Sequence, residues 1–263
     1  MNIAAVILAA GKGTRMGSVE GSEKPKVMHL ANGKPMVEYS IKAIKESGVH
    51  RVVLVIGYKR EQVEEYFGQS VEYALQEEQL GTGHAVMMAK PNLEGQSDAV
   101  LTCYGDMPLF KAETIRRLID KFEEEKPAIA MLTVDFEDPE FWAFGRIIRN
   151  EEGYVVANVE QKDCAPEQLK IKESNPGFYI FDAEFLWANI EKLKAENAQA
   201  EYYLPDLIKM ANDQGKKIVA VKVSSEDEVL GVNTPEQLAK AEEILIQREK
   251  EAADMSAGEV ATA

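Results

Sequence analysis

Short apolar runs alternate with longer amphipathic segments along most of the chain. The apolar runs have the length of strands and lie at residues 3–8, 51–56, 71–75, 99–104 and 129–134. Segments of helical length separate them. This alternation is typical of βαβ units, and it predicts an α/β protein with a mainly parallel sheet flanked by helices.

Helical periodicity fills the intervals between these runs. Pro35 precedes and Gly48 follows a segment in which Val37, Ile41 and Ile44 fall on one helical face. Proline at the start and glycine just past the end are typical boundaries of a helix. The same spacing of apolar residues predicts helices over 36–47, 61–67, 83–89, 112–124, 184–195 and 203–213.

The pattern changes in the second half of the chain. Residues 146–148 and 154–158 are strand-like, and a short polar segment with Gly153 joins them, which predicts a β-hairpin. A helical pattern begins at Thr234 and continues to about residue 251. The last residues, 252–263, are small, polar and acidic, and we expect them to be disordered.

Composition excludes several classes of protein. The chain has 263 residues, of which 45% are hydrophobic, so a wholly disordered chain is excluded. Its 45 acidic and 30 basic residues give a net charge of −15, which argues against binding to nucleic acid or to an anionic membrane. Any anionic ligand must therefore be met by a local basic pocket.

Cysteine and histidine residues are too scattered to build a structural site. Cys103, Cys164 and the histidines His29, His50 and His84 show no paired metal-ligand spacing, so a disulfide scaffold and a zinc finger are both excluded. The first apolar run is too short to span a bilayer and has no basic residue before it. We therefore expect a soluble cytoplasmic protein.

A glycine-rich segment follows the first predicted strand. Residues 8–16 read Leu-Ala-Ala-Gly-Lys-Gly-Thr-Arg-Met, in which glycines let backbone N–H groups approach phosphates and Lys12 and Arg15 add positive charge. The spacing fits neither a Walker A loop nor a dinucleotide fingerprint. Lys26 is a third cation nearby, and three cations at this place suit a triphosphate. The alternatives are that the glycines serve only tight packing and that Lys26 is a solvated surface lysine.

Polar residues also follow later strands. Gln76 and Gln79 precede a Gly-Thr-Gly turn, and their amides can both donate and accept, which suits the edge of a pyrimidine. Asp106 follows a predicted buried strand and is a good ligand for a hard cation, or else a cap of the next helix. Asn233 is a second candidate ligand, with a role at a helix start as its alternative.

Several motifs, taken in order, resemble one family, the sugar-phosphate nucleotidyltransferases. They are residues 8–16, 25–27, 79–85, 104–106 and 231–233, supported by residues 144–146, 159–163, 175–177 and 201–203. Within the family, the chain is most similar to the uridylyltransferase domain of the bifunctional bacterial enzyme that makes UDP-N-acetylglucosamine. The resemblance implies a Rossmann-like, mixed but mainly parallel sheet of the nucleotide-diphospho-sugar transferase type, with a small β-rich sugar-binding insertion. It also implies a nucleotidyltransferase domain over residues 1–237, followed by a C-terminal helix and acidic tail over residues 238–263.

The resemblance further implies an activity and a role for each matching residue. UTP and N-acetylglucosamine 1-phosphate would react to UDP-N-acetylglucosamine and pyrophosphate, with Mg²⁺ as cofactor and no nucleic-acid or membrane partner. Arg15 and Lys26 would grip the phosphates as catalytic residues, and Asp106 and Asn233 would hold the Mg²⁺. The nucleotide would lie on Leu8, Ala9, Ala10, Gly11, Gln76, Gly81 and Thr82. The sugar would lie on Tyr104, Gly105, Gly145, Glu160, Lys162 and Asn175.

Some residues on the sugar side depart from the family pattern. Ala143 and Phe144 replace a usual glycine-tyrosine pair, and Pro176 and Pro205 stand where threonine is usual. A different sugar 1-phosphate or base is therefore an alternative, as is a catalytically idle nucleotide-sugar sensor. The chain ends without hexapeptide repeats, so we expect neither acetyl transfer nor the trimer that such repeats would build. The sequence predicts no particular oligomeric state and fits either a free-standing enzyme or an excised domain.

Overall fold

One large mixed sheet organises the protein. The computed structural model describes residues 1–13, 16, 23–139 and 143–262, with side chains up to residue 254. Within these residues the sheet order is β5-β4-β1-β6-β11-β7-β10-β8-β9, with β12 paired to β7, and β2 and β3 form a separate small ribbon. The strands are β1 (Ile3–Leu8), β2 (Leu30–Ala31), β3 (Lys34–Pro35), β4 (Arg51–Ile56), β5 (Glu72–Leu75), β6 (Ala99–Tyr104), β7 (Ile129–Asp135), β8 (Gly145–Arg149), β9 (Val155–Val159), β10 (Glu173–Asn175), β11 (Tyr179–Asp182) and β12 (Ile218–Lys222).

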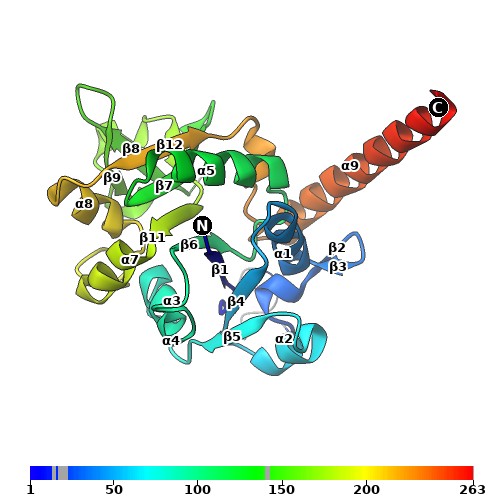
Figure 1. Cartoon of the computed structure of the whole chain (residues 1–263), viewed down its shortest axis with the longest axis horizontal. Coiled ribbons are helices and arrows are strands. Elements are labelled where there is room, and N and C mark those ends of the chain that lie inside the picture. Colours follow the sequence, from blue (N-terminus) through cyan, green and yellow to red (C-terminus); the bar gives the residue numbers. More distant parts are fainter. Residues whose placement is uncertain (14–15, 17–22, 140–142, 263) are drawn as a thin grey trace.

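Helices cover both faces of this sheet. Figure 1 shows α1 and α5 on one side and α3, α7 and α8 on the other. Alternating strands and helices predicted this α/β arrangement, and the structure confirms it. The helices are α1 (Met36–Glu46), α2 (Arg60–Phe67), α3 (Thr82–Met88), α4 (Lys90–Leu93), α5 (Ala112–Glu125), α6 (Pro166–Leu169), α7 (Ala183–Asn189), α8 (Asp206–Asp213) and α9 (Pro235–Thr262).

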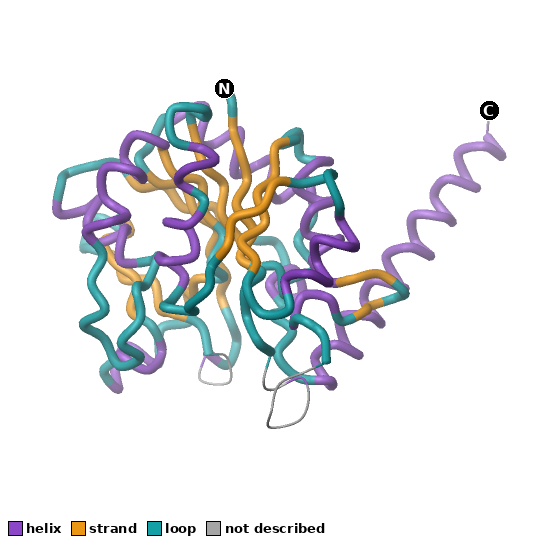
Figure 2. The backbone as a smooth tube through the Cα atoms, turned by 90° about the horizontal axis from the view of Figure 1, so that it is seen from below, coloured by secondary structure: helices purple, strands orange, loops and turns teal. Residues whose placement is uncertain are grey.

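Strand β1 lies at the centre of the parallel part. It pairs in parallel with β4 on one side and with β6 on the other. Residues 4–7 are fully buried, as expected for a strand covered on both faces, which explains its continuous apolar sequence. Figure 2 shows the strands running from the end of the molecule that holds the N-terminus toward the opposite edge, where connecting loops gather.

Amphipathic helices complete two hydrophobic cores, one on each face of the sheet. In α5, the residues Ile115, Leu118, Ile119 and Phe122 recur at helical spacing and are all buried in the core on one face of the sheet. On the other face, α7 and α8 pack apolar residues such as Leu186 against the sheet. The fold therefore has three layers, with the sheet in the middle.

The second half of the sheet is antiparallel. Strand β11 enters between β6 and β7 and is antiparallel to both. The predicted hairpin is confirmed as β8 and β9, in which Ile147 lies opposite Asn158. The β-rich insertion expected from the resemblance is thus an extension of the main sheet through β10.

Two predicted helices differ at their ends. The helix predicted over residues 203–213 begins only at Asp206, because Pro205 disfavours helical geometry in the residue before it. The helix predicted over residues 184–195 ends at Asn189 and gives way to one 3₁₀ turn, Ile190–Lys192.

The C-terminal helix α9 differs most from expectation. It continues to Thr262, whereas the composition of residues 252–263 predicted disorder. These residues are rich in alanine, which has the highest helix propensity, so the helix can continue without packing partners. The expected boundary between residues 237 and 238 lies within α9, which begins at Pro235. Ala241 and Leu245 of this helix are buried together with Leu109 and Leu230 of the main domain. Beyond this contact α9 projects away from the body (Figure 1).

No helix within the described residues combines the length and the apolar character needed to cross a membrane.

Candidate active site

Two adjoining cavities lie at the carboxyl ends of the central strands. One, the Gln76 cavity, has a volume of about 240 Å³, and the other, the Glu160 cavity, about 320 Å³. They share Lys26, Tyr104 and Asp106 as a common wall. In open α/β sheets, ligands bind at this edge of the strands, so the position itself indicates a binding site.

The Gln76 cavity is formed by the loops after β1 and β5 and by the start of α3. Most residues predicted to hold a nucleotide line it. Ala9 does not, because its N–H donates to Val55 O (2.9 Å) inside the sheet. The lining residues are Leu8, Ala10, Gly11, Lys26, Val27, Gln76, Gln79, Gly81, Thr82, Ala85, Tyr104, Asp106 and Glu201.

The amide of Gln76 is held in one orientation. Its Nε2 donates to Gly81 O (3.1 Å) and lies 3.1 Å from His84 Nδ1. A carbonyl oxygen only accepts, so the atom facing Gly81 must be the nitrogen, and Nδ1 of His84 is then the acceptor of the second bond. Gln76 therefore has its Oε1 as the acceptor left for a ligand.

A tight contact with the segment before α8 shapes the turn after Gln76. Gly81 has φ +110°, and a Cβ there would lie 2.7 Å from Tyr202 O. Gly83 N donates to Tyr202 O (2.7 Å), and Leu204 N donates to Thr82 Oγ1 (3.0 Å). Glycine is required at Gly81 and Gly83 because two backbone segments touch here.

The common wall carries the charged centre of the site. Pro25 precedes a 3₁₀ turn, Lys26–Met28, that presents the Lys26 side chain. Its Nζ contacts the Asp106 carboxylate and donates to Asn233 Oδ1 (2.8 Å). Val232 N donates to Asp106 O (2.9 Å), which joins the end of β6 to the segment before α9. Three residues from distant parts of the chain thus converge on one point.

This centre fits a hard divalent cation. The side-chain oxygens of Asp106 and Asn233 already face a single positive group, the Lys26 ammonium, and carboxylate and amide oxygens are ligands that Mg²⁺ accepts. In the described part of the chain, this centre included, no cluster of three or more His, Cys, Asp or Glu side chains could hold a metal. A site with few protein ligands is typical of Mg²⁺ that also binds substrate phosphates.

The Glu160 cavity extends from this centre over the antiparallel part of the sheet. Burial raises the pKa of Glu160, and Asp206 and Asp163 raise it further, whereas a hydrogen bond from Asn158 and the charge of Arg146 lower it. Asn158 Nδ2 donates to Glu160 Oε1 at 2.8 Å. The cavity is lined by Lys26, Tyr104, Asp106, Met107, Ala143, Phe144, Gly145, Glu160, Asn175, Gly231 and Asn233.

Tyr104 stands between the two cavities. Burial raises the pKa of its hydroxyl well above the usual value, and the nearby Glu160 and Asp106 add to the shift, so the group remains a neutral donor. Its ring packs on Gly177, which has φ +77° and no room for a Cβ. Gly105 is less constrained, since a Cβ there would lie 3.0 Å from Val27 Cγ1.

Asn175 lines the cavity but is already engaged. Its Oδ1 accepts from Gly177 N (3.0 Å), and its Nδ2 donates to Tyr179 Oη. The second hydrogen on Nδ2 is the remaining donor for a ligand. Asn175 therefore also shapes the turn that carries Gly177.

Besides Ala9, two predicted site residues within the described part of the chain line neither cavity. Lys162 donates from Nζ to Gln199 Oε1 (2.6 Å) and lines neither cavity. Gly105 lies behind the lining, with its N–H on Leu8 O (3.0 Å). Arg15 lies outside the described residues.

The lining also includes residues that the sequence did not single out as site residues. Glu201 reaches the Gln76 cavity from the segment before α8, and Met107 and Gly231 border the Glu160 cavity. Glu201 belongs to a motif of the family resemblance, but its place beside Gly81 depends on a tertiary contact that no local pattern indicates.

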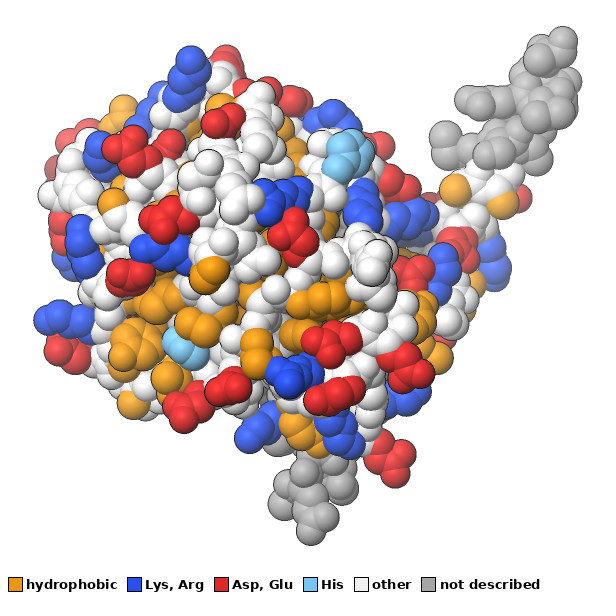
Figure 3. Space-filling view, turned by 60° about the horizontal axis from the view of Figure 1, so that its bottom comes forward, with side chains coloured by type: hydrophobic (Ala, Val, Ile, Leu, Met, Phe, Trp, Pro, Cys, Tyr) orange, Lys and Arg blue, Asp and Glu red, His pale blue; other side chains and the backbone are white. Residues whose placement is uncertain are grey.

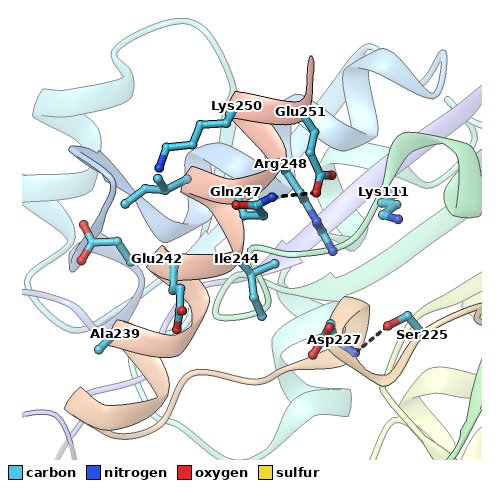
Figure 4. Close-up of a pocket in the computed structure, with 12 residues that line it drawn as sticks. Lys111, Ser225, Asp227, Ala239, Glu242, Ile244, Gln247, Arg248, Lys250 and Glu251 are labelled. Carbon is cyan, nitrogen blue, oxygen red and sulfur yellow. Dashed lines mark hydrogen bonds between the residues drawn. The ribbon is translucent and has the colours of Figure 1, made fainter. Parts of the chain in front are cut away.

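A larger groove of about 830 Å³ lies elsewhere, between α9 and the turn Glu226–Val229. Figure 4 shows two hydrogen bonds in it: Gln247 Nε2 donates to Glu251 Oε1 (2.9 Å), and the backbone N–H of Asp227 donates to Ser225 Oγ (3.2 Å). Among the described residues it shares none with the two cavities at the strand ends. It is the space that α9 leaves as it departs from the domain.

The outer surface adds no extended basic region on the side seen in Figure 3. There, lysines and arginines of the described chain are interspersed with aspartates and glutamates. On this face, positive charge for an anionic ligand is therefore available only locally, as expected from the net charge of −15.

Comparison with known proteins agrees with this architecture. The model of the MobA-like NTP transferase domain matches residues 5–197. The bifunctional protein GlmU of Exiguobacterium sibiricum is 45% identical over 251 residues, which are 95% of this chain and 55% of the relative. That of Geobacter metallireducens is 44% identical over 249 residues, 94% of this chain and 51% of the relative. The chain thus spans about half the length of these curated relatives.

Solved structures with low sequence identity share the fold. A UDP-glucose pyrophosphorylase complexed with UDP-glucose superposes with a TM-score of 0.77 at 16% identity, covering 94% of this chain and 100% of that one. A glucose-1-phosphate thymidylyltransferase from Bacillus anthracis, described as putative and bound to sucrose, gives 0.74 at 20% identity, with 92% and 94% covered.

Proposed function

The chain belongs to the family of MobA-like NTP transferase domains, and we propose that it transfers the uridylyl group of UTP to N-acetylglucosamine 1-phosphate. A phosphate oxygen of the sugar phosphate attacks the α-phosphorus of UTP. The bond from that phosphorus to the bridging oxygen of the β-phosphate breaks, and pyrophosphate leaves with the electron pair. The products are UDP-N-acetylglucosamine and pyrophosphate.

One observation carries this proposal: the two cavities meet at Lys26, Tyr104 and Asp106. A reaction between a nucleotide and a second anionic substrate needs two neighbouring pockets with positive charge at their junction. The Gln76 cavity has an amide that suits a base, and the Glu160 cavity has a carboxylate that suits sugar hydroxyls. The similarity to GlmU proteins supports UTP and N-acetylglucosamine 1-phosphate as the pair.

On the nucleotide side, Gln76 selects the base. Its fixed Oε1 accepts a hydrogen bond, and N3 of uracil carries a hydrogen whereas N3 of cytosine does not. Backbone groups of Leu8, Ala10 and Gly11 form the floor of the same cavity. Selection of uracil over cytosine follows from this hydrogen-bond polarity.

At the junction, Lys26 offsets the negative charge of the phosphates, and the family resemblance gives Arg15 the same role. Asp106 and Asn233 would hold the Mg²⁺, which supplies charge neutralisation on the phosphate oxygens when bound. A phosphate monoester is already a competent nucleophile, so no covalent intermediate with the protein is needed. The protein mainly orients two mutually repelling anions.

On the sugar side, Glu160 accepts hydrogen bonds from hydroxyls, and Asn175 offers its second amide hydrogen. Gly145 lines the same cavity, and it has no side chain because a Cβ there would meet the Asn158 carboxamide. Lys162 is not needed in this arrangement, since it lines neither cavity. The cytoplasm, where UTP is available, is part of this proposal.

The experiment that tests the proposal measures pyrophosphate release with Mg²⁺. UTP is paired in turn with the 1-phosphates of N-acetylglucosamine, glucosamine, glucose and galactose, and N-acetylglucosamine 1-phosphate is paired with UTP, CTP, TTP and ATP. The highest kcat/KM is expected for UTP with N-acetylglucosamine 1-phosphate. Tight UTP binding without turnover on any partner would instead identify a nucleotide-sugar sensor.

A different sugar 1-phosphate is the second candidate, and one observation favours it. Ala143 and Phe144, where the family usually has glycine and tyrosine, both lie in the lining of the Glu160 cavity. A change in the wall of the pocket can change which sugar fits. Higher kcat/KM with one of the other three sugar phosphates would support this candidate.

A further inference from the structure

The side chain of Asn158 supports the Glu160 cavity from behind. Asn158 lies on β9, two residues before Glu160, so the two side chains point to the same face of the sheet. Its Nδ2 donates to Glu160 Oε1 at 2.8 Å. Its carboxamide also fills the space where Gly145 would carry a Cβ. One amide thus touches two residues of the cavity lining without being part of that lining.

The buried amide of Asn158 does not favour the folded state. Asn158 Oδ1 is buried and has no hydrogen-bond partner within the described structure. A buried carbonyl oxygen without a donor destabilises a protein, and an apolar side chain of the same shape would avoid that cost. The bond from Nδ2 to Glu160 is the interaction that an apolar residue could not provide. It therefore points to a role in the site.

The surroundings make that bond important to Glu160. Asp206 at the start of α8 and Asp163 in the turn after β9 both disfavour a charged Glu160, as does burial. The neutral hydroxyls of Tyr104 and Tyr179 face it from β6 and β11. Arg146 on β8 and the Asn158 amide act in the opposite direction. An ionised carboxylate accepts only, so the donor Nδ2 fits the charged form of Glu160.

We propose that Asn158 is a positioning residue that holds Glu160 as a charged, oriented acceptor for the hydroxyls of the sugar 1-phosphate. The inference rests on the proposed function and deepens it, since it assigns a determinant of sugar affinity outside the cavity lining. Asn158 acts through Glu160 and does not itself touch the substrate.

Two substitutions and a matched control test the proposal. Asn158→Leu removes the donor and the unpaired oxygen together, so KM for the sugar phosphate should rise about tenfold, the effect of one hydrogen bond to a charged group. KM for UTP should stay within about twofold, and the thermal midpoint should stay equal or rise. Asn158→Asp places a second carboxylate beside Glu160 and should raise KM further. Thr102→Val is the control, since Thr102 Oγ1 is also buried without a partner but lies in strand β6.

A titration separates this inference from the proposed function. In protein labelled with ¹³C at glutamate carboxyls, the Glu160 signal is identified by its loss in Glu160→Gln, and its pKa is measured without any substrate. The pKa should be higher in Asn158→Leu than in wild type and unchanged in Thr102→Val. An unchanged pKa in Asn158→Leu would overturn the inference whatever the enzyme's substrate is. Equal rises of both KM values with a lower thermal midpoint would show a structural role only and would also overturn it.

Discussion

The ammonium group of Lys26 occupies the point where the side-chain oxygens of Asp106 and Asn233 converge. These are the oxygens proposed to hold Mg²⁺. A lysine ammonium and a metal ion cannot share the same close contacts, so we expect that binding of the ion is coupled to movement of Lys26 toward the phosphates. The side chain is well placed for both states because only 14% of it is exposed and it lies between the two cavities.

Replacement of Lys26 should therefore separate catalysis from ion binding. In Lys26→Ala, turnover should fall roughly 10²- to 10³-fold, as for loss of one group that stabilises transition-state charge. The affinity for Mn²⁺, used as a spectroscopic substitute for Mg²⁺, should rise because the competing ammonium is gone. Steady-state kinetics and electron paramagnetic resonance measure the two effects. Turnover close to that of wild type would contradict the role of Lys26. Arg15→Ala should lower turnover by a similar factor.

Asp106 should be required for the ion. Asp106→Asn keeps the shape of the side chain but removes its charge, so the affinity for Mn²⁺ should fall at least about tenfold. Asp120→Asn, at an exposed position of α5, is the control for a change of net charge alone. Equal loss of Mn²⁺ affinity in both variants would argue against a ligand role for Asp106.

His84 should influence base selection through Gln76. Its Nδ1 accepts from Gln76 Nε2, which keeps Oε1 as the acceptor for the base. In His84→Leu only the bond to Gly81 O still holds the Gln76 amide, so its NH₂ group should reach the base more often and the preference for UTP over CTP in kcat/KM should fall, by up to about tenfold. The comparison needs only the two nucleotides with one sugar phosphate. An unchanged ratio would show that Gln76 is oriented without His84.

Gly177 should be sensitive to a single methyl group. It has φ +77°, and a Cβ would overlap the Tyr104 ring, so Gly177→Ala should lower the free energy of unfolding by about 2–3 kcal/mol and disturb both cavities. Gly153→Ala is a matched control, because Gly153 has φ +85° and open space around its Cα. It should cost about 1 kcal/mol or less in urea unfolding, from the backbone conformation alone. Equal costs would mean that the Tyr104 contact adds nothing.

Asp206 should make stability depend on pH. Burial and the nearby Asp163 raise its pKa from 3.8 to about 6. Since the folded state holds the proton more tightly, its contribution to stability is fully present below pH 3.8 and is lost as the pH rises through about 6. Asp206→Asn should therefore be about 1 kcal/mol more stable than wild type at pH 7.5, a value reduced for partial exposure, and equal at pH 3.5. Urea unfolding at both pH values measures this, and an equal gain at both would point to a cause other than ionisation.

The local pattern of apolar and polar residues was sufficient to predict most of the helices and strands. The runs at β1, β4 and β6 are continuous apolar segments because both faces of those strands are covered, and this made them visible in the sequence. The hairpin of β8 and β9 was also predictable, because a glycine between two strand-like segments indicates a turn. In the structure Gly153 adopts φ +85° in that turn. In each case the signal lies within a few consecutive residues.

Pairing between distant strands left no such signal. Strand β11 lies antiparallel between β6 and β7, although it follows both in sequence by many residues. Its apolar sequence specifies burial but not a partner. The full length of α9 was missed for a different reason. The small, polar and acidic composition of residues 252–263 shows that this segment cannot form a packed core, but a segment without a core can still be helical when its residues have high helix propensity.

Some residues of the candidate site could be predicted from the sequence and others could not. Lys26, Asp106 and Gln76 follow strands of the parallel part, so their meeting at one edge was predictable from topology. Lys162 is close to Glu160 in sequence, but its side chain donates a hydrogen bond to Gln199 and lies outside the cavity lining. Asn158 was overlooked because its importance depends on contacts with Gly145 and Glu160 across a hairpin.

The bond from Val232 to Asp106 gives the site a dependence on the order of synthesis. The strand that carries Asp106 emerges from the ribosome long before Asn233, and Asn233 is fixed by Gln237 in the first turn of α9 (2.7 Å). A nascent chain can fold its central strands early, but the group formed by Lys26, Asp106 and Asn233 is complete only when the start of α9 has been made and has docked. A chain whose translation stops before Asn233 lacks one of the two oxygens proposed to hold Mg²⁺.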